Sequence, residues 1–226
     1  MDSSRFDPIR TMAKMTDEVI VAFSGGKESI VVLDLCVKHF KRVVPFFMYY
    51  VPGLSFQEKQ LRWYEDKYGL EIVRLPHFEL SNLMRYGTYR NIDLDVPIIG
   101  MNEIYQWMRE TYGINWIAAG ERSGDSVIRG AMIKHSGSID EKRGRFYPVA
   151  WWTKQEILDY IRVKKLYQGM DSRVMGTSFH GINTPSLVFL NEYFPTDYQR
   201  ALRLFPLAEG AITRYKTYGK KQVSEL

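Results

Sequence analysis

The fold is decided by one stretch, Val19-Ile20-Val21-Ala22-Phe23-Ser24-Gly25-Gly26-Lys27-Glu28-Ser29. Its first half is a short apolar run rich in β-branched residues, which predicts a buried strand. The run ends in a serine and two glycines, and a helix-patterned stretch follows over residues 30–40. A strand, a glycine turn and a helix in this order aim backbone N–H groups at one point, at the positive end of the helix dipole. The stretch therefore predicts a phosphate site.

The side chains of this loop suit the same ligand. Gly25 and Gly26 allow positive φ and a close backbone approach. Ser24 and Ser29 can add hydroxyl donors, and Lys27 adds a point charge. The alternative is a tight turn with solvated side chains, and the strand and helix in register on either side favour the phosphate site.

Better-known phosphate loops do not fit this stretch. A Walker A loop needs a glycine at the position of Val21 and a serine or threonine at that of Glu28, and no G-x-G-x-x-G is present. Ser24 to Ser29, S-G-G-K-E-S, instead resembles the PP-loop of ATP pyrophosphatases, S-G-G-x-D-S. Glu28 stands where that family has aspartate.

Composition bounds the class of protein. The chain has 226 residues, which suits one ordinary domain with a small C-terminal extension, and 45% apolar residues, which is a globular profile. Its formal net charge of +5 suits an anionic substrate or a nucleic acid. The excess is small and spread along the chain, so an ordinary basic surface is favoured over a dedicated nucleic-acid face.

Cysteine usage excludes several kinds of site. Cys36 is the only cysteine, so an internal disulfide, a cysteine-ligated iron–sulfur cluster and a structural zinc site of the C-x-x-C type are excluded. It lies within a helix pattern and is expected to be a small buried residue. Neither a signal peptide nor a membrane-length apolar run is seen, so we expect a cytoplasmic protein that does not enter a membrane.

Strands and helices alternate along the first two thirds of the chain. A short helix is expected within residues 1–17, strands at 18–23, 43–50, 70–75 and 115–119, and helices at 29–40, 56–68 and 101–112. This alternation predicts βαβ units and a doubly wound, mostly parallel sheet. Because ligands bind at the carboxyl ends of such strands, residues 24–29 and 120–129 are expected to face one pocket.

The second of these segments is rich in arginine and serine. Arg122 and Arg129 are fork-shaped phosphate binders, and Ser123 and Ser126 can donate further hydrogen bonds. The alternative is a solvated basic loop, and the phosphate loop on the neighbouring strand favours a functional role.

The spacing of Gly120, Arg122, Ser126 and Arg129 resembles the motif after the fourth strand of phosphoadenosine-phosphosulfate (PAPS) reductases. ATP sulfurylase small subunits carry a related segment. Residues 146–161 resemble a downstream signature of this superfamily, in which Thr153 and Glu156 form a capping box and Trp151, Trp152 and Ile157 are expected to pack. The resemblance implies a three-layer α/β/α fold with a five-stranded sheet. We expect a lead-in at 1–17, a nucleotide-binding domain at 18–168 and a C-terminal helical extension at 169–226 that packs on or near the site.

Departures from the family limit the chemistry. PAPS reductases carry a late cysteine that attacks the sulfuryl group, and this chain has none after Cys36. The Asp-Thr pair that follows strand two in relatives is also missing here. Sulfur transfer through a cysteine or an iron–sulfur cluster is therefore not expected.

The resemblance implies cleavage of ATP between the α- and β-phosphates, with adenylylation of an anionic or nucleotide acceptor. Lys27, Arg122 and Arg129 would be catalytic, and Mg²⁺ would be placed by Glu28 or Asp125, since Asp34 is expected to point outward. Nucleotide binding would use these residues: Ser24, Gly25, Gly26, Lys27, Glu28, Ser29, Met48, Tyr49, Gly120 and Ser126.

Other functions stay open. The missing Asp-Thr pair is compatible with a catalytically silent nucleotide-binding regulator, and the charge and aromatic content with a component of a nucleic-acid modification system. The acceptor is unassigned, and a homodimer is left open. Among the histidines, His39 and His77 are expected to be structural or at the surface, while His135 and His180 can reach the site, although a solvated loop is favoured. For the basic tail at 214–221, a solvated role is favoured over contact with the pocket or with nucleic acid.

Overall fold

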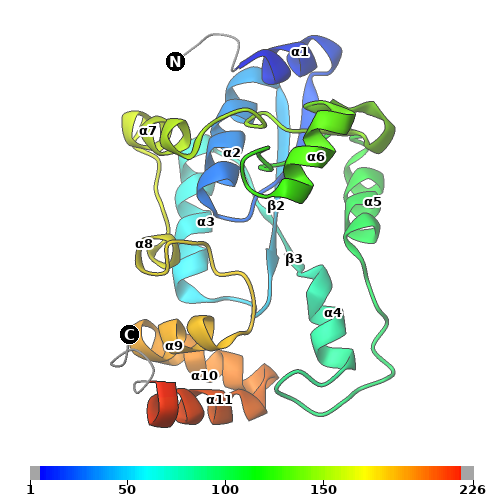
Figure 1. The fold of residues 1–226 in the computed structure, drawn as a ribbon. Helices are drawn as coiled ribbons and strands as arrows, with labels where there is room; N and C mark the ends of the chain where they lie inside the picture. The colour runs from blue at the N-terminus through cyan, green and yellow to red at the C-terminus, as the bar shows by residue number, and fades with distance from the viewer. Residues whose placement is uncertain (1–5, 220–226) are drawn as a thin grey trace.

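A computed structural model describes residues 6–219 (Figure 1). The strands form a single sheet in the order β3-β2-β1-β4-β6-β5. Their bounds are β1 Glu18–Ala22, β2 Arg42–Tyr49, β3 Val73–Pro76, β4 Ile117–Ala118, β5 Ile139–Asp140 and β6 Arg145–Phe146. The helices that accompany this sheet are α1 Asp7–Met15, α2 Lys27–His39, α3 Ser55–Tyr68, α4 Phe78–Arg85, α5 Met101–Tyr112, α6 Val127–Ser136 and α7 Lys154–Lys164.

The doubly wound sheet is confirmed, with one more strand than expected. β1 pairs in parallel with β2 on one side and with β4 on the other, so the chain reverses its winding direction at β1. The additional strand is β5, which pairs antiparallel with β6 at the sheet edge. It has only two residues, which is too short for an alternating pattern to be visible in the sequence. The third strand also starts later than expected, at Val73.

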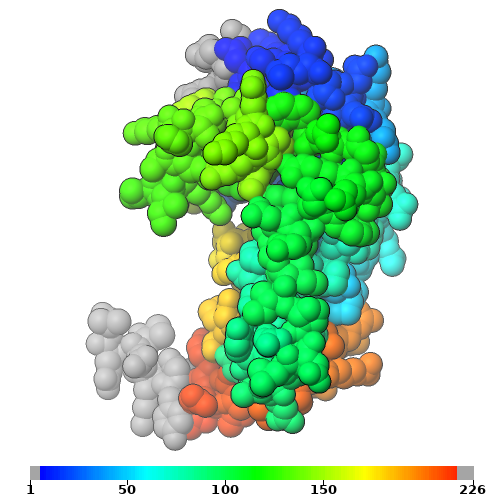
Figure 2. All heavy atoms as spheres, turned by 90° about the vertical axis from the view of Figure 1, so that its right-hand side faces the viewer, coloured from blue at the N-terminus to red at the C-terminus, as the bar shows by residue number. Residues whose placement is uncertain are grey.

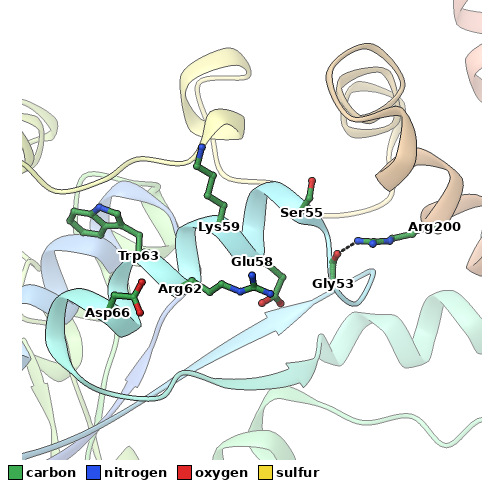
Figure 3. Close-up of a pocket in the computed structure, with 8 residues that line it drawn as sticks. All are labelled: Gly53, Ser55, Glu58, Lys59, Arg62, Trp63, Asp66 and Arg200. Atoms are coloured by element: carbon green, nitrogen blue, oxygen red, sulfur yellow. Dashed lines mark hydrogen bonds between the residues drawn. The ribbon is translucent and has the colours of Figure 1, made fainter.

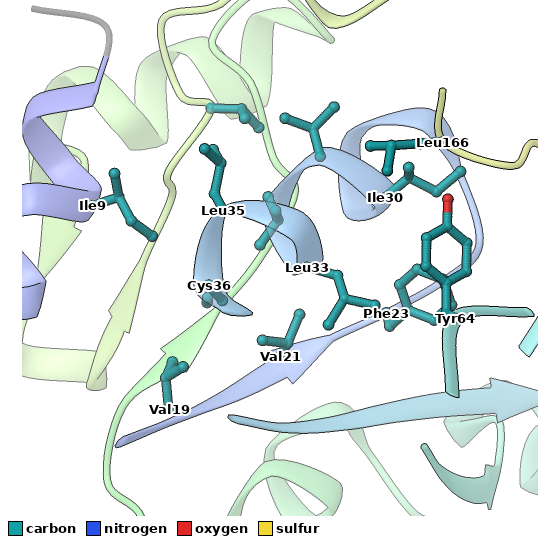
Figure 4. Packing of buried hydrophobic residues seen from close by; sticks show 14 of the residues in the cluster. Ile9, Val19, Val21, Phe23, Ile30, Leu33, Leu35, Cys36, Tyr64 and Leu166 are labelled. Atoms are coloured by element: carbon teal, nitrogen blue, oxygen red, sulfur yellow. The ribbon is translucent and has the colours of Figure 1, made fainter. Parts of the chain in front are cut away.

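Helices cover both faces of the sheet, which gives the three-layer arrangement. One face packs against α1, α2, α3 and α7, where Val21 of β1 and Phe23 just after it meet Ile30 and Leu33 of α2 (Figure 4). The other face packs against α5, where Ile20 contacts a cluster with Met108. β1 is thus buried on both sides, as its uninterrupted apolar run predicts for a central parallel strand.

Several local predictions are confirmed. Cys36 is fully buried in the core, and Thr153 and Glu156 form the expected capping box at the start of α7. Helices α3 and α5 end at Gly69 and Gly113, which take the left-handed conformation that glycine tolerates best.

None of the helices in residues 6–219 is both long and apolar enough to cross a membrane.

Two local predictions are wrong. Trp152 and Ile157 are buried, but Trp151 is 41% exposed because it lies in the turn that precedes α7. Asp34 does not point outward from α2. It is 2% exposed, accepts hydrogen bonds from Tyr68 and Tyr160, and forms an ion pair with Lys38. These partners lie on α3 and α7 as well as α2, so the pattern of one helix could not reveal them.

The buried Asp34 carboxylate makes stability depend on acid. Burial raises its pKa, but the hydrogen bonds from Lys38, Tyr160 and Tyr68 outweigh this effect, so the net pKa is lowered. A lowered folded-state pKa contributes stability that is complete above the unfolded pKa of about 3.9 and is lost as pH falls below it. We expect Asp34→Asn to lower the free energy of unfolding by about 2 kcal/mol at pH 7, with a difference that shrinks below about pH 4.

Urea unfolding of both proteins across this pH range measures the effect. Asp17→Asn is the control, because Asp17 pairs with Lys41 on the surface, where both side chains are more than half exposed. The lowered pKa of Asp34 is contradicted if both variants lose the same free energy of unfolding, or if the difference between Asp34→Asn and the wild type grows toward low pH.

Three C-terminal helices pack together at the end of the molecule far from α1, and α8 Met170–Val174 lies nearer its middle (Figure 1). The three helices are α9 Thr184–Tyr193, α10 Pro195–Leu204 and α11 Glu209–Arg214. Their apolar residues form a second core with Phe56 of α3. Asp197 of α10, 1% exposed, accepts a hydrogen bond from the Ser55 backbone N–H at 2.7 Å and so supplies the N-terminal cap that α3 lacks. The basic tail continues beyond the described residues.

Candidate functional site

The predicted phosphate loop joins β1 to α2, and hydrogen bonds of its own serines stabilise it. The Ser29 hydroxyl donates to the Gly26 carbonyl at 2.9 Å and accepts from the Ser24 backbone N–H at 3.2 Å. Ser29 therefore shapes the loop, because its one hydroxyl hydrogen is already used there. Gly26 is the N-cap of α2 and no side chain caps the helix. The first N–H groups of α2 thus remain available to an anion.

Gly25 fits a conformation that other residues rarely adopt. Its φ is +73°, and an added Cβ would lie 2.7 Å from Gln60 Oε1. The Gln60 amide nitrogen donates to the Gly25 carbonyl at 3.0 Å. Gln60 lies on α3 and is buried, so it fixes the outer wall of the loop. This contact has no signal in the sequence near the loop.

The two predicted arginines have different surroundings. Arg122 is 8% exposed, with Nη2 2.6 Å from Asp125 Oδ1 and Nε 3.3 Å from Glu28 Oε1. Its Nη1 also donates to the Trp152 carbonyl at 3.2 Å. The Arg129 side chain is 53% exposed and lies 3.5 Å from Asp125 Oδ2. Arg122 thus links α2 to the segment after β4 through its ion pairs with Glu28 and Asp125. Of the two arginines, Arg129 has the guanidinium that is more accessible to a phosphate.

The two segments meet in one cavity of about 530 Å³ at the carboxyl ends of the strands. Figure 2 shows the molecule hollowed between the green and yellow-green region around α6 and the orange and red C-terminal helices. The predicted residues that line this cavity are Ser24, Gly26, Lys27, Glu28, Ser29, Met48, Gly120, Arg122, Asp125 and Arg129.

Three predicted residues do not line this cavity. Gly25 faces Gln60. The Ser126 hydroxyl caps α6 by accepting a hydrogen bond from the Arg129 backbone N–H at 3.2 Å. Tyr49 lines a separate apolar hollow, because successive side chains of a strand point to opposite faces. Its neighbours in the chain, Met48 and Tyr50, line the predicted cavity instead.

An aromatic wall of the cavity was not predicted. The rings of Tyr50 and His77 stack with centroids 4.2 Å apart, and the Tyr50 hydroxyl donates to Glu79. His77 Nδ1 accepts from the Glu79 backbone N–H at 3.2 Å, which leaves the ring hydrogen on Nε2, 3.4 Å from the Tyr50 hydroxyl. Burial lowers the pKa of His77 and raises that of Tyr50, so this wall is uncharged near neutral pH.

His77 has the structural role expected of it, because its side chain caps α4, and it also lines the cavity. His77 follows the third strand directly, which was the available signal, since residues at carboxyl ends of parallel strands approach the site.

The C-terminal segment also reaches this cavity, through Thr177, Ser178, Phe179 and His180. The Ser178 hydroxyl lies 3.3 Å from where a Gly26 Cβ would stand, so this loop closes over the phosphate loop. The small polar residues at 177–180 were a weak signal, because such a composition is equally typical of solvated loops.

Carboxylates line the cavity beside its cations. They belong to Glu28, Glu121 and Asp125. Burial raises the pKa of Glu121. Within residues 6–219, no three histidine, cysteine, aspartate or glutamate side chains gather as a metal-binding group.

Known proteins share this architecture. An uncharacterised protein from Methanocaldococcus jannaschii is 26% identical over 161 residues, which cover 69% of this chain, and the chain spans about a third of that relative's length, 33%. The PAPS reductase from Candida auris, solved as a phosphate complex, has a TM-score of 0.54 at 15% identity and covers 78% of this chain and 87% of its own. That likeness shows the fold.

Two further solved structures have lower TM-scores. The NH₃-dependent NAD synthetase from Campylobacter jejuni gives 0.48 at 15% identity, covering 97% of both chains. The U34-tRNA thiolase NcsA from Methanococcus maripaludis, which holds a [4Fe-4S] cluster, gives 0.46 at 14% identity, covering 91% of this chain and 79% of its own.

A family model also matches this chain. The model of the phosphoadenosine phosphosulfate reductase domain matches residues 18–168, which is more than half of the sequence. The matched residues run from the strand before the phosphate loop to the end of α7 and include the arginine segment. The chain therefore belongs to the phosphoadenosine phosphosulfate reductase domain family.

Proposed function

We propose that this protein binds ATP and cleaves it between the α- and β-phosphates, transferring the adenylyl group to an acceptor. The observation that carries the proposal is the meeting of the uncapped α2 N-terminus, Lys27 and Arg129 in one cavity. Backbone N–H groups and two cations there match the charge of a triphosphate. Because the described chain offers only the buried Cys36, we propose no cysteine-dependent reduction.

In this reaction an acceptor oxygen attacks the α-phosphorus. A new oxygen–phosphorus bond forms, the bond to the α,β-bridging oxygen breaks, and pyrophosphate leaves with that electron pair. Lys27 and the α2 N–H groups would hold the β- and γ-phosphates and stabilise the leaving pyrophosphate. Arg129 would orient the α-phosphate or the acceptor anion. Arg122 would hold Glu28 and Asp125 in place, so it is a positioning residue.

Magnesium fits this donor set as an ion that arrives with the nucleotide. Mg²⁺ commonly takes one or two carboxylates and completes its shell with phosphate oxygens and water. Glu28 and Asp125 are the carboxylates that would hold it, although both contact Arg122 in this structure. The bound ion would neutralise charge on the phosphates.

Pyrophosphate release tests the proposal. ATP labelled at the γ-phosphate is incubated with the full chain, Mg²⁺ and candidate acceptors such as sulfate, nucleotides or nucleic acid, and the products are separated. Labelled pyrophosphate together with an adenylylated acceptor is expected, and labelled inorganic phosphate alone contradicts the bond assignment. If ATP binds but no pyrophosphate is released with any of the acceptors, a catalytically silent regulator is favoured, which is also compatible with the missing Asp-Thr pair after β2.

A further inference from the structure

A second hollow, of about 630 Å³, lies along α3 (Figure 3), and it shares no lining residue with the phosphate cavity. Lys59 and Arg62 of α3 and Arg200 of α10 line it. Arg200 and Arg203 also line another hollow on α10, so Arg200 lines both hollows. The sequence separates these cations widely, and the docking of α10 on the start of α3 brings them together.

Aromatic rings extend this basic surface along α3. The Trp63 and Tyr167 rings lie 5.8 Å apart at an angle of 31°. Lys67 Nζ lies 5.3 Å from the Trp63 ring centre, and the Arg173 guanidinium lies 5.7 Å from that of Tyr167. These cation–π contacts restrain two long side chains, which lowers the entropy lost when they bind an anion. We name the six cations the basic stripe: Lys59, Arg62, Lys67, Arg173, Arg200 and Arg203.

Few carboxylates balance the stripe. Glu58 lines the hollow but forms an ion pair with Arg74, whose Nη2 lies 3.1 Å from Glu58 Oε2. Asp66 is the other acidic residue that lines it. Within the described part of the chain, Lys59, Arg62 and Lys67 have no carboxylate within ion-pair distance. Arg200 pairs with Asp197 at 3.3 Å. The stripe still carries a net positive charge, because Lys59, Arg62 and Lys67 lack such a partner among the described residues.

We propose that the basic stripe binds the phosphodiester backbone of a nucleic acid. Lys59 and Lys67 are eight residues apart on one helix, about 12 Å at the helical rise, and α8 and α10 extend the stripe further. A chain of regularly repeated charges matches such an extended surface better than a single small anion does. Since the Trp63 ring already contacts Tyr167 and Lys67, the stripe recognises charge and not base identity.

The stripe lies one helix away from the phosphate cavity. Gln60, beside Lys59 in the chain, touches the phosphate loop from the inner side of α3. Arg173 precedes the segment at 177–180 that lines the cavity. A bound strand would therefore run beside the nucleotide site. Binding by the stripe does not require ATP cleavage, so the proposal of nucleic-acid binding and the proposal of ATP cleavage can be tested independently.

Fluorescence anisotropy of the full chain with a labelled single-stranded RNA of about 30 nucleotides, and with DNA of the same sequence, tests the proposal. With six contacts, affinity is expected to fall about 100-fold or more as salt rises from about 50 to about 200 mM. Lys59→Gln with Arg62→Gln should flatten the slope of log affinity against log salt by about 1.4, since each lost phosphate contact contributes about 0.7. Asp66→Asn should tighten binding.

Lys14→Gln with Lys142→Gln is the matched control, because it removes two exposed cations remote from the stripe and should leave the slope unchanged. Lys27→Ala should retain nucleic-acid binding, and the stripe variant should retain ATP binding, so failure of one proposal is distinct from failure of the other. Equal slopes in the wild type and the stripe variant overturn the proposal. So does binding of anionic phospholipid vesicles or polyglutamate at an affinity equal to that of the oligonucleotides.

Discussion

Replacing Lys27 with alanine is expected to weaken binding of a non-hydrolysable ATP analogue by about 10- to 100-fold, because a charge-assisted phosphate contact contributes about 1.5–3 kcal/mol. Lys27 begins α2, lines the phosphate cavity and is only 3.4 Å from Glu28. Its loss removes a cation beside the helix N-terminus and leaves Glu28 to repel the phosphates. Isothermal titration calorimetry measures the affinity directly.

The comparison with Lys14→Ala makes this result specific. Lys14 is an exposed cation on α1, so its loss changes the net charge equally without touching the cavity. Lys27→Arg keeps the charge but not the compact ammonium, and should recover part of the affinity. If Lys27→Ala binds the analogue as tightly as the wild type does, the assignment of the loop as the nucleotide site is wrong.

Replacing Arg122 with leucine is expected to lower the free energy of unfolding by about 3–5 kcal/mol, the usual effect of removing one partner from a buried ion pair. The side chains of Arg122, Glu28 and Asp125 are 9%, 18% and 14% exposed, so the two carboxylates would remain largely buried without their cation. The midpoint of thermal unfolding should fall by about 6 °C or more. Differential scanning calorimetry without nucleotide checks this expectation.

Arg129→Leu is the matched comparison. Its side chain is 53% exposed and its partner among the described residues, Asp125, is 3.5 Å away, so we expect a stability change within about 0.5 kcal/mol. Arg129→Leu should instead reduce turnover or affinity for the nucleotide. Adding Asp125→Leu to Arg122→Leu should restore part of the stability, since it removes one stranded charge. Equal destabilisation by the two single arginine variants would contradict the different roles that the structure gives them.

Much of the sheet and its helices could be predicted from local sequence pattern. The apolar run before Ser24 requires a strand buried on both faces, and the two glycines after it require a tight turn before a helix. Both features depend on neighbouring residues only, so they can be predicted without knowing how the rest of the chain folds. The ends of short strands are less visible, and the two-residue β5 was missed because its pairing depends on a partner and not on a pattern.

The sequence by itself determined the strand, glycine turn and helix that begin at Val19, the winding of the sheet and the single cysteine. Only the tertiary structure decided that Arg122 is a buried tie while Arg129 is open, since the two arginines share one motif and differ in what surrounds them. It also decided that His77 and Ser178 face the cavity and that Arg200 joins Lys59 beside α3. Each of these facts joins residues from separate elements, and the distance between such residues is set by how helices pack on the sheet, which no local pattern encodes.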